Sequence, residues 1–206
     1  MAEKPILFSA PMIRALLAGT KTQTRRVCKQ QPSATAEFCR YDQFGSAIFT
    51  DGTVARLRYA VGDVLWARET WAVHEEFDAH VARGERVGPG LLFYRADADD
   101  DVLPISRWRP SIHLPRWASR LSLEVTEVRC QRLQDISEAD AGAEGCEGYY
   151  LPPAVIAGEI SGPDGKMPSE EYRDLWDSIN GKTHPWASNP WVFAYTFKQL
   201  EAANDR

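Results

Sequence analysis

The sequence lacks the features that would mark a membrane, secreted or metal-binding protein. No apolar run reaches the roughly 18 residues of a membrane-spanning helix, and the start, MAEKPILFSA, has no signal-peptide pattern. The four histidines form no HxH or HExxH spacing, and no CxxC pair occurs among Cys28, Cys39, Cys130 and Cys146. We therefore expect a cytoplasmic protein with free thiols, without a membrane association and without a metal site.

Acidic residues are missing from two long segments, although the chain is acidic as a whole. The 206 residues carry 29 Asp and Glu against 24 Lys and Arg, a formal charge of −5. Residues 4–36 nevertheless hold six Lys or Arg, and residues 105–120 hold four Arg, with no acid in either. This distribution disfavours coating of duplex nucleic acid and suits a small anionic or nucleotide ligand. Scattered solvated charge is the alternative.

Hydrophobic patterning predicts more strands than helices, without a repeat and without a linker between two cores. Strands are expected at 5–9, 22–28, 61–72, 91–96, 119–133 and 191–198, and a hairpin at Asp51-Gly52. Helices are expected at 9–19, 136–145 and 169–181, where Ser9, Ser137 and Ser169 stand as candidate caps. Because regular βαβ alternation is missing, we expect one α+β domain over residues 1–206, a mixed and mostly antiparallel barrel with a few flanking helices.

The segment GTKTQTRR, residues 19–26, is rich in hydroxyls and positive charge. It suits a phosphate site, an activated nucleophile or a solvated turn. A neutral Lys21 amine can take a proton from the Thr24 hydroxyl, which can then attack an acyl carbon. Residues three apart point to opposite faces of a regular strand, so this pairing needs a bend near Gly19. Strand parity also favours Arg26 over Arg25 as the arginine beside Thr24.

Glu144 stands at the C-terminal end of an expected short helix, where the helix dipole disfavours a carboxylate. An acid at such a place can indicate a cationic partner, and Lys21 is the candidate. Simple exposure is the alternative, since Glu147 lies close by. Several aromatic residues could stack on a nucleobase, although most such residues belong to the core: Trp66, Trp71, Tyr94, Trp108 and Trp117.

The spacing Gly19-x-Lys21-x-x-Thr24-x-Arg26 resembles the signature of the ASCH domains, a branch of the PUA-like fold. Thr24 replaces the glutamate of the general pattern, as in the compact bacterial N4-acetylcytidine amidohydrolases, which the motif resembles more closely. The segments GDVLWARE (62–69), LEVTEVRCQRLQDISEADAGAEG and NPWVFAYTFK are similar to further parts of the family pattern. The whole chain also resembles ASCH-like proteins of phages and prophages. Residues 28–60, 72–118 and 146–190 are insertions relative to the compact enzymes.

The resemblance implies a PUA-like barrel that hydrolyses the N4-acyl amide of cytidine without a cofactor. Lys21 is then the general base, Thr24 the nucleophile or its hydrogen-bonding partner, and Glu144 the residue that orients Lys21 and passes a proton to the leaving amine. Arg26, Trp66 and Glu69 are the implied substrate-binding residues. The expected partner is a nucleoside or an RNA-derived ligand, with weak single-stranded RNA binding. A non-catalytic RNA- or modified-base-binding module and a ribonuclease are the alternatives.

Overall fold

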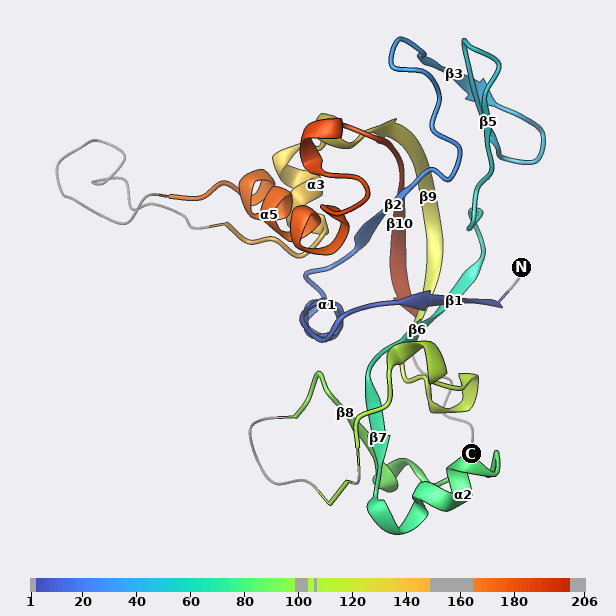
Figure 1. Ribbon diagram of the computed structural model, residues 1–206, viewed down its shortest axis with the longest axis vertical. Coiled ribbons are helices and arrows are strands. Elements are labelled where there is room, and N and C mark those ends of the chain that lie inside the picture. The colour runs from blue at the N-terminus through green and yellow to red at the C-terminus, as the bar shows by residue number, and fades with distance from the viewer. Residues whose placement is uncertain (1–2, 99–103, 106, 149–164, 201–206) are drawn as a thin grey trace, which may run out of the picture. The chain divides into compact units, whose positions relative to one another are not determined.

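The computed structural model describes residues 3–98, 104–105, 107–148 and 165–200 (Figure 1). The chain divides into two compact units, each built from separated segments. The first unit holds the described residues of Met1–Gly19, Val61–Val125 and Phe197–Arg206, and the second those of Thr20–Ala60 and Thr126–Thr196. Two long strands, β9 (Ser122–Arg132) and β10 (Trp191–Leu200), belong to both, so no single linker divides the units.

The first unit contains a parallel strand pair and a separate two-stranded sheet. Strand β1 (Glu3–Leu7) pairs in parallel with β6 (Val64–Arg68), and β6 pairs antiparallel with the start of β9. Strands β7 (Trp71–Val73) and β8 (Leu92–Tyr94) form an antiparallel pair. The α-helices are α1 (Ala10–Leu17) and α2 (Asp78–Ala82). The short 3-10 helices are η1 (Glu75–Phe77), η2 (Pro89–Leu91), η3 (Ser111–His113) and η4 (Arg116–Ala118).

The second unit carries the motif segment. Strand β2 (Gln23–Val27) pairs antiparallel with β10, and Thr24 lies opposite Tyr195. Strands β3 (Phe38–Tyr41), β4 (Ala47–Phe49) and β5 (Val54–Ala55) form a small antiparallel sheet. The helices of this unit are α3 (Glu138–Ala143) and α5 (Pro168–Asn180), which pack against each other, and the 3-10 helices η5 (Leu133–Asp135) and η6 (Trp186–Ser188). The five-stranded order reads β1-β6-β9-β10-β2.

The architecture is therefore mixed α+β, with mostly antiparallel sheets and few helices. Among the described strands, the five-stranded sheet has β1 and β2 as its edge strands, and no closed barrel is found. The expected α+β class is confirmed at this level. Within the described residues no helix is long and apolar enough to cross a membrane.

Local signals explain most of the element boundaries. Helix α1 has Pro11 in its first turn and ends before Gly19, whose φ of +76° suits glycine. Ser137 caps α3, because its hydroxyl accepts a hydrogen bond from the Asp140 amide. The cap expected at Ser169 is wrong: α5 starts one residue earlier, with Met167 at its N-cap and Pro168 in the first turn.

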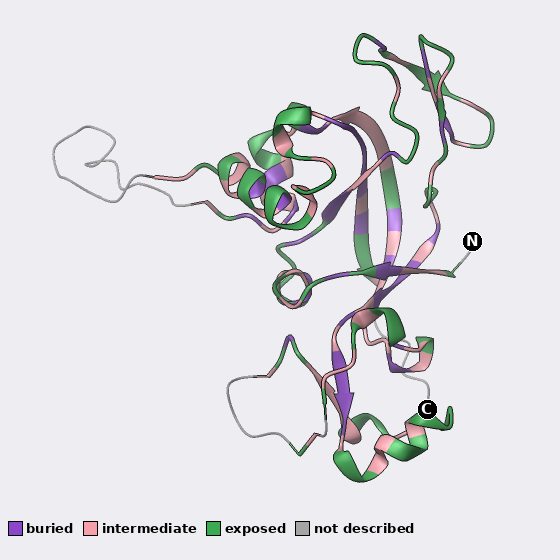
Figure 2. Ribbon diagram, in the orientation of Figure 1, coloured by how far each residue is buried: buried purple, intermediate pink, exposed green. Residues whose placement is uncertain are grey.

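Each unit has its own apolar cluster. In the second unit, α3, α5 and the strands bury Leu133, Ala141, Cys146, Tyr172, Trp176 and Val192 (Figure 2). The first unit buries Trp71, Val73, Leu114 and Ala118, and Tyr94 and Trp117 pack against this cluster. Of the aromatic residues considered for base stacking, Trp66 and Trp71 are thus buried core residues, and Tyr94 and Trp117 are partly buried against the core. Ile179 follows Tyr172 and Trp176 at helical spacing on α5 but is 55% exposed, because it lies in the last turn of that helix.

Candidate active site

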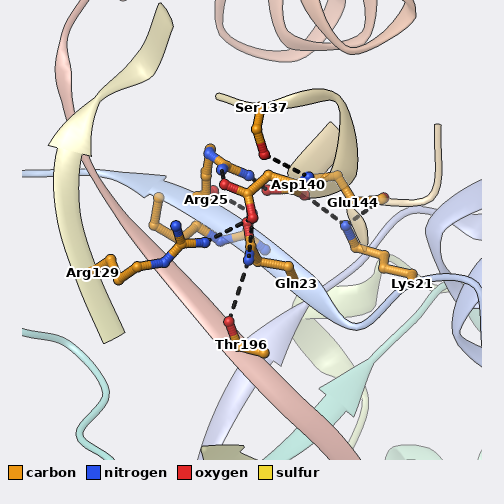
Figure 3. Close-up of polar contacts among 9 residues, drawn as sticks. Lys21, Gln23, Arg25, Arg129, Ser137, Asp140, Glu144 and Thr196 are labelled. Carbon is orange, nitrogen blue, oxygen red and sulfur yellow. Dashed lines mark hydrogen bonds and ion pairs between the residues drawn. The ribbon is translucent and has the colours of Figure 1, made fainter. Parts of the chain in front are cut away.

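Lys21 and Glu144 meet where the chain enters β2 and leaves α3. The Thr22 amide donates a hydrogen bond of 2.8 Å to the Ala143 carbonyl, which fixes the start of β2 against the end of α3. Lys21 Nζ then lies 2.8 Å from Glu144 Oε2 and 2.8 Å from the Glu144 carbonyl oxygen (Figure 3). The predicted pairing of these two residues is therefore present. The lysine is buried, not in the solvated turn that was the alternative.

Burial shapes the chemistry of this pair. Loss of hydration lowers the pKa of Lys21, and the Glu144 carboxylate only partly offsets this effect. The charge of Arg26 adds a smaller lowering of the same pKa. A buried lysine with a depressed pKa can release its proton nearer to neutral pH than an exposed one. The amine is thus suited to act as a general base.

Arg25, not Arg26, completes the ion cluster. Arg25 Nη1 lies 3.1 Å from Glu144 Oε1, and Arg25 Nη2 lies 3.0 Å from Asp140 Oδ2. Its side chain is fully buried, and its guanidinium also lies 5.7 Å from the centre of the Tyr172 ring. Arg26 is half-buried and donates to the Arg25 carbonyl oxygen at 3.2 Å. Strand parity accounts for the difference, because Gln23 and Arg25 point to the face of β2 that meets α3.

Three side chains donate hydrogen bonds to the Asp140 carboxylate. Its Oδ1 accepts from Gln23 Nε2 at 3.1 Å and from Arg129 Nη2 at 2.8 Å, and its Oδ2 accepts from Arg25 (Figure 3). Burial would raise the pKa of Asp140, but these hydrogen bonds and the arginine charges outweigh burial and lower it. Asp140 is therefore held as an anion beside Arg25.

Thr24 lies in the same strand but does not bond to the lysine. Its side chain is buried, and its Oγ1 has no hydrogen-bond partner among the described residues. Parity places Thr24 and Arg26 on the face of β2 opposite to Arg25. The structure therefore brings Lys21 and Glu144 into contact and leaves the Thr24 hydroxyl close in sequence, buried and unpaired.

The other two expected substrate-binding residues belong to the first unit and make their contacts there. The Trp66 ring lies 4.7 Å from the Arg68 guanidinium and 6.0 Å from that of Arg116. Glu69 accepts two hydrogen bonds from Arg120, at 2.9 and 3.0 Å. Burial raises the pKa of Glu69, and Arg120 opposes that shift. Both side chains thus already hold cationic partners.

Arg25 and Asp140 were missed from the sequence, although a signal was available. Asp140 and Glu144 are four residues apart, so they share one face of a helix. That face carries two carboxylates toward a strand that is free of acid and rich in arginine. The described residues contain no group of three or more His, Cys, Asp or Glu placed to hold a metal ion.

Comparison of the chain with protein-family models, with curated proteins and with solved structures finds no match in any of the three. The resemblance to ASCH domains rests on the sequence motif, and the site rests on its geometry.

Proposed function

We propose that the centre formed by Lys21, Thr24 and Glu144 hydrolyses the N4-acyl amide of acylated cytidine. The observation that carries this proposal is the buried Lys21 amine, held 2.8 Å from Glu144 Oε2. Three residues further along the chain lies the buried Thr24 hydroxyl, which has no hydrogen-bond partner among the described residues. A base, a carboxylate that orients it and a hydroxyl are the groups that amide hydrolysis needs. The motif's resemblance to the amidohydrolases supplies the substrate class.

In the proposed reaction, neutral Lys21 takes a proton from the Thr24 hydroxyl or from a water that this hydroxyl orients. The oxygen attacks the acyl carbon, and the bond from that carbon to the exocyclic nitrogen breaks. Glu144, which orients Lys21, passes the proton from Lys21 to the departing amine. With Thr24 as nucleophile, a water then cleaves the acyl ester, so that the products are cytidine and a carboxylic acid. The proposal requires Lys21 and Thr24 to come together when substrate binds, as catalytic hydrogen bonds that are long in the free enzyme commonly do.

Substrate recognition is assigned in the proposal to Arg26. Trp66 and Glu69 belong to the other compact unit and stay predictions from the family resemblance. Arg26 is half-buried and lies on the same face of β2 as Thr24, so it suits the cytosine carbonyl or an anionic group. Trp66 is buried and its ring lies against the Arg68 guanidinium, so a base could stack on this ring only if these groups moved. The reaction requires no metal or organic cofactor. We also propose that the described sheets are part of a PUA-like barrel.

One observation favours non-catalytic binding of RNA or a modified base over hydrolysis: Thr24 Oγ1 accepts no hydrogen bond from Lys21. The ribonuclease alternative requires Lys21 and Arg26 on the scissile phosphate. It has less support, because the charge of Lys21 is already paired with the Glu144 carboxylate.

The proposal is tested by incubating the protein with N4-acetylcytidine and, separately, with short single-stranded RNA, and by separating the products chromatographically. We expect cytidine and acetate in equal amounts, and intact RNA. RNA fragments without release of cytidine from N4-acetylcytidine would indicate a ribonuclease. Bound but unchanged N4-acetylcytidine would favour the binding module.

A further inference from the structure

Two cations share the Glu144 carboxylate. Lys21 Nζ lies 2.8 Å from Oε2, and Arg25 Nη1 lies 3.1 Å from Oε1. The side chains of Lys21 and Arg25 are fully buried, and that of Glu144 is 3% exposed. A buried anion without a cationic partner is strongly unfavourable. Loss of the Lys21 proton would create such an anion if Lys21 were the only partner of Glu144.

Arg25 provides a second cation for Glu144, and a contact with Asp140 fixes the position of Arg25. Its second nitrogen, Nη2, lies 3.0 Å from Asp140 Oδ2. The Asp140 carboxylate in turn accepts hydrogen bonds from Gln23 and Arg129. The Asp140 main-chain amide donates a hydrogen bond to the Ser137 hydroxyl that caps α3 (Figure 3). A guanidinium presents a rigid, planar set of donors and keeps its charge at all physiological pH values. It can therefore bridge two carboxylates where an ammonium group would serve one.

We propose that Arg25 is a positioning residue of this centre: anchored by Asp140, it neutralises Glu144 and so allows Lys21 to give up its proton. The inference deepens the proposed hydrolase function and rests on it for its catalytic meaning. Arg25 itself acts through Glu144. It therefore differs in role from Arg26, which lies on the opposite face of β2.

The other groups that face Lys21 do not replace Arg25. Besides Glu144, they include Arg26 and the Cys146 thiol. Burial raises the pKa of Cys146 to about 12, so this thiol stays neutral near physiological pH. Tyr172, on α5, faces Glu144 and Arg25, and burial raises its pKa as well. Near neutral pH, the charged groups that act on Lys21 thus include Glu144 and Arg26, and Arg25 and Asp140 are connected to Lys21 through Glu144.

The test compares wild type with Arg25→Gln by nuclear magnetic resonance of the Lys21 side chain over a pH series. In parallel, the pH dependence of N4-acetylcytidine hydrolysis is measured. Removing a neighbouring charge typically moves a pKa by about 1–3 units. We expect Lys21 to titrate at least about one unit higher in Arg25→Gln, with the acidic limb of the rate profile moving by the same amount. Arg173→Gln, which removes an exposed arginine paired with Asp174, is the charge-matched control. It should leave the Lys21 titration and the pH–rate profile unchanged.

Arg25→Lys keeps the charge but cannot bond to both carboxylates. We expect its Lys21 titration to fall between those of wild type and Arg25→Gln, which also makes it the comparison if Arg25→Gln does not fold. An unchanged Lys21 titration in these variants would overturn the inference. So would failure of both to fold while Arg173→Gln folds, because Arg25 would then be a structural residue. The resonance measurement needs no turnover, so the inference is tested separately from the hydrolase function.

Discussion

Lys21 Nζ donates to both the side-chain and the main-chain oxygen of Glu144, each at 2.8 Å, although the two residues are 123 positions apart. The contact joins Lys21, two residues before β2, to Glu144, the residue after α3. The hydrogen bond to the Glu144 carboxylate couples the charges of the two side chains. The hydrogen bond to the Glu144 carbonyl oxygen fixes the end of α3. Changes to either residue should therefore affect both function and local structure.

Glu144→Gln tests the carboxylate. Glutamine keeps the size and one acceptor oxygen, but it cannot pair as an anion with Lys21 and Arg25. General acid–base assistance contributes about 10²–10⁴-fold, so we expect at least about a hundredfold loss of turnover with N4-acetylcytidine and a smaller change in affinity. Steady-state kinetics provide the measurement.

Glu147→Gln is the control for this substitution, because Glu147 is exposed and three residues further along the chain. It should behave like wild type. Loss of turnover in Glu147→Gln but not in Glu144→Gln would move the carboxylate role to Glu147. If neither variant loses turnover, the role of a carboxylate is refuted.

Thr24→Val separates stability from chemistry. The substitution keeps the shape and removes a buried hydroxyl that has no hydrogen-bond partner in the described part of the chain. An unsatisfied buried polar group costs about 1–3 kcal/mol, so the melting temperature should hold or rise. Turnover should fall at least about a hundredfold, while Thr24→Ser, which retains the hydroxyl, should stay active. Active Thr24→Val would eliminate Thr24 as nucleophile.

Cysteine alkylation tests the described packing without reference to function. Cys28 and Cys146 are buried, Cys39 is exposed, and burial raises the pKa of Cys146 to about 12. Because the thiolate is the reactive form, iodoacetamide at about pH 8 should label Cys39 at least about tenfold faster than Cys146. Peptide mass spectrometry gives the order of labelling. Early modification of Cys146 in the native protein would contradict the packing of α3 against α5.

Binding of short single-stranded RNA should be weak and only slightly sensitive to salt. For single strands, log affinity falls with log salt at a slope of about 0.7 per phosphate neutralised. Lys21 and Arg25 already pair with carboxylates, which leaves few basic groups of the motif for phosphates. Fluorescence anisotropy at several salt concentrations measures the slope. Tight binding with a steep slope and no turnover would instead support the RNA-binding module.

The sequence predicted most elements because their signals are local. The cap at Ser137, the stop at Gly145 and the alternation of Leu121, Leu123 and Val125 each specify structure within a few residues. The pairing of Lys21 with Glu144 was also predicted, from a carboxylate at an unfavourable helix end and from the family resemblance.

The choice between Arg25 and Arg26 could not be made locally. It depends on which face of β2 meets α3, and this is set by packing between segments distant in sequence. Val27, on the same face as Arg25, packs against the cluster of α3 and α5. The four-residue spacing of Asp140 and Glu144 indicates a shared helix face, but the partners of Asp140 come from β2 and β9 and could not be identified locally.

Lys21→Arg tests the central claim most directly. The substitution keeps a positive charge beside Glu144, but a guanidinium cannot release its proton at neutral pH. The measurement is the rate of cytidine release from N4-acetylcytidine by wild type and by Lys21→Arg at equal folded concentration, verified by melting temperature. We predict a loss of at least about a hundredfold in the variant. Release at the wild-type rate would show that Lys21 contributes charge alone and would contradict its role as general base.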